Sequence, residues 1–531
     1  MVSTGKADNG SAMNAIRICG RNLSIEEVLA VVDGAPVTLD PAAISAMERS
    51  HQAVADLVQA GTVAYGITTG FGRFKDCIIS AEQTAELQVN LVRSHAVGVG
   101  EPLSPRDVRA LMLARANTLA MGHSGVRPCV VQRLVDFLNR NIHPRIPAQG
   151  SLGASGDLAP LAHMALVLIG EGEAEVDGRL LTGSGVHRQA GWEPLKLEAK
   201  EGLALLNGTA FMVGLGALAV SRATHLVETA DIAAAMTLEA LHGTARAYDE
   251  RVHALRPHPR QIECAAFLRR LLEGSGFLRN DDPNNVQDPY TLRCVPQVHG
   301  AVRDAVAYAR WVIEIELNSA NDNPLIWIDE KTGKPDVISA GNFHGEPIAL
   351  AMDYMKLAIA EIGNMSERRI ARMVDADCNQ DVLPMFLTAH GGIESGFMLA
   401  QYTAAALASE NKVLAHPASA DSIPSSANVE DHVSMGPIAV RHAHRILEHT
   451  ETIVAIELLC AAQGIDFRKR VLGPDIPLGR GTDAVYRLIR GSVPFLDRDR
   501  VLAPWIETLR ALVSKGRIRD AAMNASFTEI D

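Results

Sequence analysis

The sequence has few aromatic residues, which make up only 4% of its 531 positions, whereas alanine and leucine are abundant. Strands favour aromatic and β-branched side chains, while helices favour alanine and leucine. The composition therefore argues against a β-sandwich and predicts helices packed on small side chains. Apolar residues make up 47% of the chain and charged residues 21%. These values exclude a disordered protein, and the length allows one large or two to three ordinary domains.

The sequence has fewer basic than acidic residues: 50 lysines and arginines against 62 aspartates and glutamates, which gives a net charge of −12. An acidic surface argues against nucleic acid and membranes as partners. The first residues have no apolar stretch, so we expect no secretory signal. One apolar run, Leu203–Val220, contains Asn207 and leads directly into Ser221 and Arg222. We interpret it as a buried core helix and not as a membrane span.

The seven cysteines are scattered and odd in number, and none forms a CxxC pair. This spacing argues against a disulfide framework and favours a reducing compartment, so we expect a cytoplasmic protein. His442, His444 and His449 cluster, but no cysteine or carboxylate falls at zinc-ligand spacing. We therefore expect no metal site.

Hydrophobic periodicity predicts three parts: a mixed N-terminal domain over residues 1–200, a central long-helix bundle over 201–465, and peripheral helices over 466–531. Hairpins are expected at 174–181 and 326–338. Predicted helices cover 41–59, 105–140, 201–245, 297–320, 345–377, 393–414 and 433–463. Helices of about 30 residues exceed the usual length and suggest a bundle shared between subunits.

The chemically informative segment is GSLGASGDLAPLAHM at residues 150–164, where small residues precede a predicted helix. Gly156 lacks a Cβ, so its backbone nitrogen can approach the carbonyl carbon of Ala154. That attack closes a five-membered ring. Loss of water from the former carbonyl and then of the Ser155 hydroxyl leaves an imidazolone with an exposed methylene. This electrophile would sit where helix N–H groups can stabilise developing negative charge. The alternative is a flexible loop with Asp157 as a helix N-cap or first-turn acid.

This segment resembles the signature of the ammonia-lyase and aminomutase family that carries 4-methylideneimidazole-5-one (MIO). The resemblance runs from about residue 60 to about residue 465 in the family's order. Other matching motifs are YGITTGFG at 65–72, EGLALLNGT at 201–209, QDPYTLR at 287–293, NSANDNP at 318–324 and GNFHGEP at 341–347. A block at 395–435, SGFMLAQYTAAALASENKVLAHPASADSIPSSANVEDHVSM, is close to histidine ammonia-lyases.

The resemblance implies a mainly α, histidase-like long-helix bundle with the electrophile loop in its mixed N-terminal domain. It implies a homotetramer whose active sites are each built from three chains, and a small-molecule amino acid substrate. It also implies MIO formed from Ala154, Ser155 and Gly156, with no external cofactor. The over-long helices predicted from periodicity agree with such a bundle.

Elimination of ammonia requires removal of a β-proton of low acidity, so the site needs a positioned base. The family's tyrosine motif makes Tyr65 the candidate, because Gly66, Gly70 and Gly72 suit a mobile loop over a site. The alternative is a glycine-rich turn or a phosphate loop, but the spacing fits neither a Rossmann nor a Walker motif.

Substrate binding is assigned through the same motifs. Arg293 is expected to clamp the carboxylate through two N–H bonds, with Tyr290 and Gln287 ordering the same polar pocket. Asn207 lies in an apolar run, where an unpaired amide is costly, and it either donates to the new ring's oxygen or binds the amine. Phe343 packs near the electrophile or in the core.

Substrate choice is assigned to His95 and Glu410. The resemblance puts His95 at the side-chain end of the pocket; the alternative is a satisfied core histidine. Glu410 projects from a predicted helix among apolar residues. A buried carboxylate needs a partner, and a substrate imidazole would be one. An ion pair with Lys412 or with another helix is the alternative.

Some positions depart from histidine ammonia-lyases. Thr68 and Ala210 stand where those enzymes commonly have Asn and Gln, and VPQVH at 295–299 is unusual. RSH at 93–95, GSLGASG and NSANDNP match bacterial tyrosine aminomutases equally well. The prediction is elimination of ammonia from L-histidine to give trans-urocanate. The alternatives are a histidine or tyrosine 2,3-aminomutase or a tyrosine or phenylalanine ammonia-lyase. A non-catalytic helical scaffold is more distant, because the intact triplet with Tyr65 and Arg293 argues against it.

Overall fold

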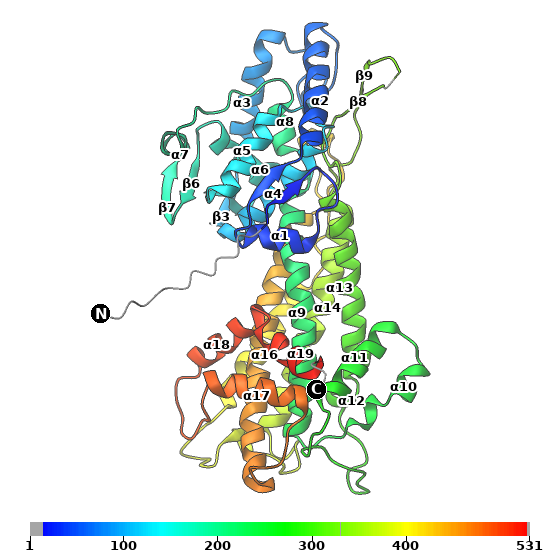
Figure 1. Ribbon diagram of the computed structural model, residues 1–531, viewed down its shortest axis with the longest axis vertical. Coiled ribbons are helices and arrows are strands. Elements are labelled where there is room, and N and C mark those ends of the chain that lie inside the picture. Colours follow the sequence, from blue (N-terminus) through cyan, green and yellow to red (C-terminus); the bar gives the residue numbers. More distant parts are fainter. Residues whose placement is uncertain (1–13, 330, 528–531) are drawn as a thin grey trace, which may run out of the picture. The chain divides into compact units, whose positions relative to one another are not determined.

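The computed structural model describes residues 14–329 and 331–527, and it is mainly helical (Figure 1). Helices make up 59% of it, in 19 α-helices. Within the described ranges the strands form four separate sheets of two or three strands each, and none closes into a barrel. The predicted mainly α fold with short strands in its N-terminal part is therefore confirmed.

The chain divides into two compact units that do not follow the order of the sequence. The first unit comprises the residues up to 218 together with 311–350 and 418–438. The second comprises 219–310, 351–417 and the residues from 439 onward. The predicted division at residues 200 and 465 stays a prediction. It divides the chain into consecutive segments, whereas each compact unit combines segments that are distant in the sequence.

The first unit holds eight helices and all of the strands. The helices are α1 (Ile25–Val32), α2 (Pro41–Gln59), α3 (Thr84–His95), α4 (Pro105–Ala120), α5 (Pro128–Asn139), α6 (Leu158–Leu168), α7 (Gly183–Ala190) and α8 (Glu201–Leu206). The strands are β1 (Ile16–Ile18), β2 (Val37–Leu39), β3 (Val99–Pro102), β4 (Ile142–Pro144), β5 (Pro147–Gln149), β6 (Glu173–Val176), β7 (Arg179–Thr182), β8 (Leu325–Ile328) and β9 (Pro335–Ile338). They pair as β1-β2, β3-β5, β4-β6-β7 and β8-β9, and only β1-β2 is parallel.

The described residues of the second unit form helices and loops but no named strand. Its own helices are α10 (Glu250–Ala254), α11 (Pro259–Leu271), α12 (Tyr290–Arg293), α15 (Met398–Leu414), α17 (Arg480–Ser492), α18 (Ala503–Ser514) and α19 (Arg517–Phe527). Four long helices have residues in both units: α9 (Ala210–Ala240), α13 (Val295–Leu317), α14 (Glu346–Val374) and α16 (Gly436–Leu472).

The predicted helix over 105–140 is wrong in one respect, because it is two helices. Gly122 and Gly125 lie between α4 and α5 with φ of +76° and +72°. These left-handed conformations suit glycine and end a right-handed helix. Pro128 then begins α5 at its first position, where a missing N–H does no harm.

The predicted helix over 201–245 is also interrupted, and the interruption serves the site. Helix α8 ends at Leu206 and α9 begins at Ala210. Asn207 is extended with ψ of 114°, and Gly208 has φ of +140°. A Cβ on Gly208 would collide with Arg115 and Asn321. The break therefore places Asn207 between the two helices, outside the helical backbone conformation.

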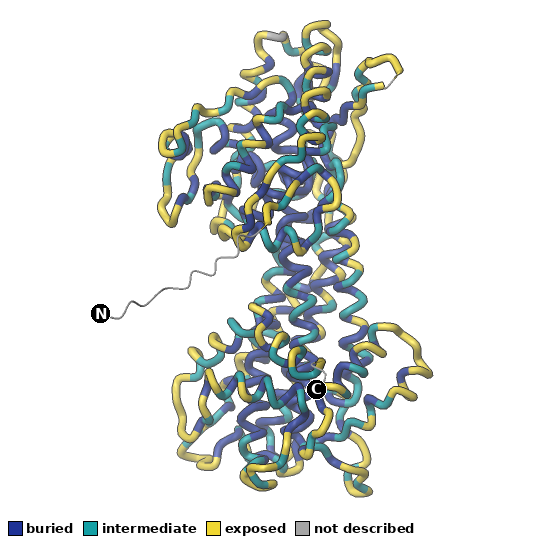
Figure 2. Tube along the Cα trace, in the orientation of Figure 1, coloured by how far each residue is buried: buried dark blue, intermediate teal, exposed yellow. Residues whose placement is uncertain are grey.

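Burial follows the long helices, which are dark blue along much of their length in Figure 2. In α9, 83% of the most apolar 18-residue window is buried, although the helix is long and apolar enough to cross a membrane. Small side chains such as Ala233, Ala234 and Ala235 are fully buried there. This is how a chain with few aromatic residues fills its core.

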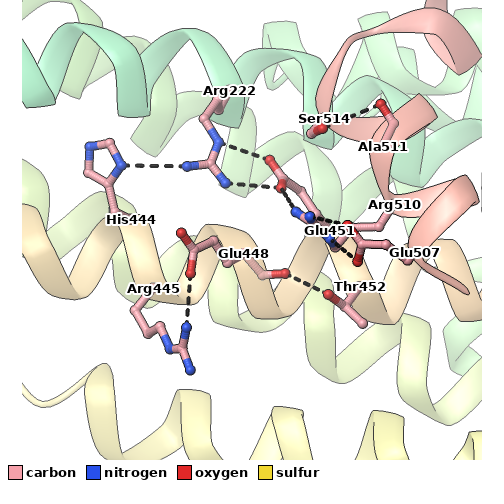
Figure 3. A network of polar contacts seen from close by, with 10 residues as sticks. All are labelled: Arg222, His444, Arg445, Glu448, Glu451, Thr452, Glu507, Arg510, Ala511 and Ser514. Atoms are coloured by element: carbon pink, nitrogen blue, oxygen red, sulfur yellow. Dashed lines mark hydrogen bonds and ion pairs between the residues drawn. The ribbon is translucent and has the colours of Figure 1, made fainter. Parts of the chain in front are cut away.

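Ion pairs connect the helices of the second unit (Figure 3). Arg222 on α9 donates to both carboxylate oxygens of Glu451 on α16, at 3.0 and 2.9 Å. Arg510 on α18 approaches the same carboxylate at 4.0 Å and also pairs with Glu507. The Glu451 side chain is 1% exposed, so the ion pair with Arg222 compensates a buried negative charge and connects α9 with α16.

Candidate active site

A pocket of about 1250 Å³ in the first unit brings together five of the residues predicted from the sequence. They are Tyr65, His95, Ser155, Asn207 and Phe343. These residues come from the loop before α3, the end of α3, the turn before α6, the break between α8 and α9, and the loop before α14. A large concave site with convergent polar groups from separate segments is the usual form of an active site.

The backbone around the triplet packs tightly against Gly208. Gly156 has φ of +77°, and a Cβ there would collide with the carbonyl group of Gly208. The Gly208 N–H donates to the Ser155 carbonyl at 3.2 Å, and the Asp157 N–H donates to the Gly208 carbonyl at 2.8 Å. Glycine is therefore required at residue 156, and the residues present fit an MIO group.

Asp157 follows the triplet and is completely buried. Its Oδ2 accepts from the backbone N–H groups of Phe211 and Met212, at 2.8 and 3.1 Å. Asp157 occupies the N-cap position of α6, but its side chain makes no capping hydrogen bond there and binds the N-terminus of α9 instead. Burial raises the pKa of this carboxyl to about 8.

Glu430 lies in this pocket and was not singled out from the sequence. Its Oε1 accepts from the Ser155 hydroxyl at 3.2 Å, and its Oε2 accepts from the Ser425 hydroxyl at 2.8 Å. Glu430 belongs to the block at 395–435, where two adjacent acids follow a short polar turn. Nothing local in the sequence distinguishes it from Asp431, because its importance comes from a contact 275 residues away.

The predicted burial of Glu410 is wrong for the chain described. Its side chain is 62% exposed on α15 in the second unit, and it does not line the first-unit pocket. The buried residues of α15 are Ala400, Ala404 and Asn411, and the position before Asn411 is about 100° away around the helix. Glu410 Oε2 lies 3.7 Å from His449 Nε2 on α16, and because burial lowers the pKa of His449 this contact is not an ion pair at neutral pH.

The environment of Tyr65 and His95 is partly desolvated. The Gly72 N–H donates to the Tyr65 hydroxyl at 3.4 Å. Burial raises the pKa of Tyr65, and the negative charge of Glu430 adds to this effect. Burial lowers the pKa of His95, so its imidazole is neutral at pH 7. Its Nδ1 lies 3.0 Å from the Ser94 hydroxyl.

The three predicted site residues of the QDPYTLR motif, Gln287, Tyr290 and Arg293, line a different pocket, of about 310 Å³, within the second unit. Gln287 and Tyr290 are exposed, and the Arg293 guanidinium lies 4.7 Å from the centre of the Tyr290 ring. Arg293 Nε is buried without a hydrogen-bond partner among the described residues. The Tyr248 hydroxyl donates to the Leu292 carbonyl at 2.7 Å and so holds the short helix α12.

One buried group in the second unit has the side chains of a metal site. Asp231, Cys264 and His299 have potential ligand atoms within 4.8 Å of one another. However, Asp231 also forms an ion pair with Arg303, and His299 Nδ1 lies 2.6 Å from its carboxylate. Burial and the Asp231 charge raise the pKa of Cys264 well above the usual value, so the thiol is a poor ligand. We assign these contacts to structure.

Comparisons with known proteins find similarity over nearly the whole chain. A family model described as "Aromatic amino acid lyase" matches residues 23–491. A histidine ammonia-lyase from Chloroflexus aurantiacus is 60% identical over 507 residues, covering 95% of this chain and 97% of that protein. The structure of a tyrosine aminomutase from Streptomyces globisporus superposes with a TM-score of 0.91 at 39% identity, covering 98% and 100% of the two chains. A histidine ammonia-lyase structure from Trypanosoma cruzi gives a TM-score of 0.86 at 39% identity, covering 98% of each.

Proposed function

The chain belongs to the aromatic amino acid lyase family, and on that premise we propose that it eliminates ammonia from L-histidine to give trans-urocanate. The observation that carries the proposal is the first-unit pocket. It contains Ser155 of the triplet together with a candidate base, Tyr65, and two groups suited to an imidazole, His95 and Glu430. The 60% identity to a histidine ammonia-lyase supports the same substrate.

We propose that Ala154, Ser155 and Gly156 form MIO. The fit is supported by the positive φ of Gly156 and its approach to Gly208. When formed, the group supplies an electrophilic carbon that activates the substrate amine as a leaving group. Its formation consumes the Ser155 hydroxyl, so Glu430 Oε1 loses that donor and can accept from a substrate instead.

We propose that Glu430, together with His95, recognises the imidazole ring of the substrate. A carboxylate accepts the ring N–H, and a neutral His95 can donate to the other ring nitrogen. A phenyl ring would leave both groups without a partner, which is costly in a partly buried site. Glu430 lines the pocket of the described chain and Glu410 does not, so the role of Glu410 expected from the sequence stays a prediction that would require its supply by another copy.

Tyr65 is our proposed base for the β-proton. Its hydroxyl must lose a proton first, and burial and the Glu430 charge oppose that loss. The Gly72 N–H partly offsets this effect by stabilising the phenolate. Leu203, Leu206 and Phe343 line the same pocket with apolar surface.

We further propose that the carboxylate clamp, Arg293 with Tyr290 and Gln287, serves the first-unit pocket of another copy in a homotetramer. Exposed large apolar side chains on α14 and α15 in the second unit support association, since burying them against another copy would remove apolar surface from water. They include Tyr354, Leu357, Leu399, Tyr402 and Val413, which are 49%, 50%, 54%, 57% and 74% exposed. Tyr290 itself is 70% exposed.

Sharing of the site between copies can be tested by complementation. Tyr65→Phe and Arg293→Ala chains are each expected to be inactive alone, while a co-expressed mixture contains some sites with both native residues. Partial recovery of activity supports sharing. No recovery in a mixed oligomer, verified by light scattering and by differential tags, excludes it.

The function itself is tested by incubating purified protein with L-histidine, L-tyrosine and L-phenylalanine and identifying products by mass and NMR. The proposal expects urocanate and ammonia from L-histidine only. Formation of a β-amino acid would identify an aminomutase, which the 39% identical tyrosine aminomutase keeps as the second candidate. Ser155→Ala is the control, and turnover equal to wild type by this variant would overturn the role of the triplet.

We also propose a cytoplasmic location. All seven cysteines are free thiols in the structure, which is compatible with a reducing compartment. Cell fractionation with an antibody to the chain tests this, and recovery in a secreted fraction would contradict it.

A further inference from the structure

The amide of Asn207 is held in one orientation by the groups around its nitrogen. Nδ2 donates to Oδ1 of Asp322 and to the backbone carbonyl of Asn323, both at 3.1 Å. A carboxylate and a carbonyl only accept hydrogen bonds, so the NH₂ group and not the amide oxygen must face them. Asn207 lines the first-unit pocket. Within the part of the chain that the structure describes, no group donates to its Oδ1.

Asp322 is in turn held by Lys200. Both side chains are 0% exposed, and Lys200 Nζ donates to Asp322 Oδ2 at 2.6 Å. The other oxygen, Oδ1, accepts from the Asn323 N–H at 2.6 Å as well as from Asn207. Arg115 is also completely buried nearby, but it donates to Ala204 and Asn321. Each oxygen of Asp322 therefore has defined donors, and Lys200 supplies the balancing charge.

The backbone at Lys200 is unusual. Its φ is +72°, a left-handed conformation that lysine rarely adopts, at the residue that precedes α8. A buried, charged side chain on an uncommon backbone persists only when the surroundings require it. Here the described contact of the Lys200 ammonium is the carboxylate that orients Asn207.

We propose that Lys200 and Asp322 are positioning residues that hold the Asn207 amide oxygen toward the pocket, where it accepts a hydrogen bond from the substrate α-amino group. The inference rests on the proposed function, because it needs an amino acid in this pocket. It chooses between the two roles that the sequence left open for Asn207. Donation to the ring oxygen would need the NH₂ group, and both of its N–H bonds are already used.

The test compares two ligands that differ only in the amine, L-histidine and 3-(imidazol-4-yl)propanoate. Their dissociation constants are measured by calorimetry in a Tyr65→Phe background, where turnover is slow. Asp322→Asn keeps the size of the side chain but can offer either oxygen or NH₂ to Asn207, so the orientation is no longer fixed. We expect histidine to bind roughly tenfold more weakly and the deamino ligand to change by less than about threefold. Lys200→Met should show the same selectivity.

Glu201→Gln is the matched control, because Glu201 is also a 0% exposed carboxylate of the first unit with a cationic partner, Arg127. It makes no hydrogen bond to Asn207. The control should leave the ratio of the two dissociation constants unchanged. A double Lys200→Met, Asp322→Asn variant removes both buried charges together and covers the case in which a single variant fails to fold.

Equal weakening of both ligands, or no weakening of histidine, would overturn the inference. An Asp322→Asn protein whose intact mass retains both waters of the triplet would also overturn it, in favour of a role in forming the electrophile. Failure of the proposed function looks different, because wild-type protein would then not distinguish L-histidine from other aromatic amino acids. In that case the same comparison is made with the amino acid that does bind and its deamino analogue.

Discussion

The two pockets that contain the predicted site residues differ in size, in origin and in what they can do. The first-unit pocket has about 1250 Å³ and is built from seven separate stretches of chain, one of which carries Ser155. The second-unit pocket has about 310 Å³, and its three predicted residues, Gln287, Tyr290 and Arg293, all come from one short motif. The first pocket contains the candidate base Tyr65 and Ser155 of the triplet that is proposed to form the electrophile. The second contains the guanidinium of Arg293 and several amide side chains.

We therefore expect the reacting groups to lie in the first pocket and the groups that bind the substrate carboxylate to lie in the second. In the proposed mechanism Ser155 and Tyr65 of the first pocket act on atoms whose bonds change, so their loss should mainly lower kcat. A guanidinium clamp binds the same carboxylate before and during the reaction, so its loss should mainly raise KM. The helix network around Glu451 lies in neither pocket and should affect only stability. Variants at these three places therefore test the comparison.

The largest effect is expected for Ser155→Ala, which removes the hydroxyl whose loss forms the electrophile. We expect kcat to fall by roughly 10³-fold or more, because an activated covalent partner is lost outright. Intact-mass measurement should show wild-type protein lighter than its encoded mass by two waters, with one or both retained in the variant. An active wild-type preparation at the unmodified mass would contradict the assignment of the triplet.

Tyr65→Phe comes next, with an expected fall in kcat of about 10²–10⁴-fold and a KM close to wild type. The pH profile adds a second readout. A base must lose its proton, and burial and Glu430 raise the pKa of Tyr65, so wild-type kcat/KM should rise with pH through the alkaline range. The variant should lose this rise. An unchanged kcat would mean that another residue removes the β-proton.

The fold was predictable where local patterns decide it and not where distant contacts do. The α2 helix was predicted residue for residue, because Pro41 at its first position and its periodicity are local signals. The breaks at Gly122 and Asn207 were missed, because apolar periodicity continues across them and only tertiary contacts require the turn. Tyr65, His95, Ser155, Asn207 and Phe343 were brought into one pocket as expected. Glu430 was missed because its partner is remote in the sequence.

A comparison of Glu430→Gln with Glu410→Gln separates the structural assignment from the one made from the sequence. Wild-type protein is expected to prefer L-histidine over L-phenylalanine by roughly 10⁴-fold in kcat/KM. Glu430→Gln should reduce this preference by about 10–10²-fold, because an amide holds an imidazole N–H more weakly than a carboxylate does. Glu410→Gln, exposed on α15, should change it by less than about twofold in the same assays. The reverse result would restore Glu410, through a contact made only between copies.

Arg293→Lys keeps the positive charge of the second pocket and loses the planar fork. We expect KM for L-histidine to rise about tenfold, with a smaller fall in kcat if the substrate shifts relative to the triplet. Steady-state kinetics at saturating substrate separates the two parameters. A fall in kcat at constant KM would break the comparison, because it would make the second pocket part of the chemistry.

The smallest effect on activity is expected for Glu451→Gln in the network of Figure 3. Its carboxylate is 1% exposed and receives two hydrogen bonds from Arg222, which is 25% exposed. Removing one charge of a buried pair leaves the other without compensation, but partial access to water reduces the cost, to roughly 2–3 kcal/mol. We expect the thermal midpoint to fall by a few degrees at a fixed scan rate, since unfolding of a large protein is often irreversible.

The same variant should keep kcat and KM within about twofold of wild type when assayed well below its thermal midpoint, because Glu451 lines neither pocket. Glu448→Gln is its control. Glu448 pairs with Arg445 three residues earlier on the exposed side of α16, where an ion pair contributes little. A loss of activity in Glu451→Gln without a loss of thermal stability would contradict the division between network and pockets. It would mean that the packing of α9 against α16 affects the position of the reacting groups.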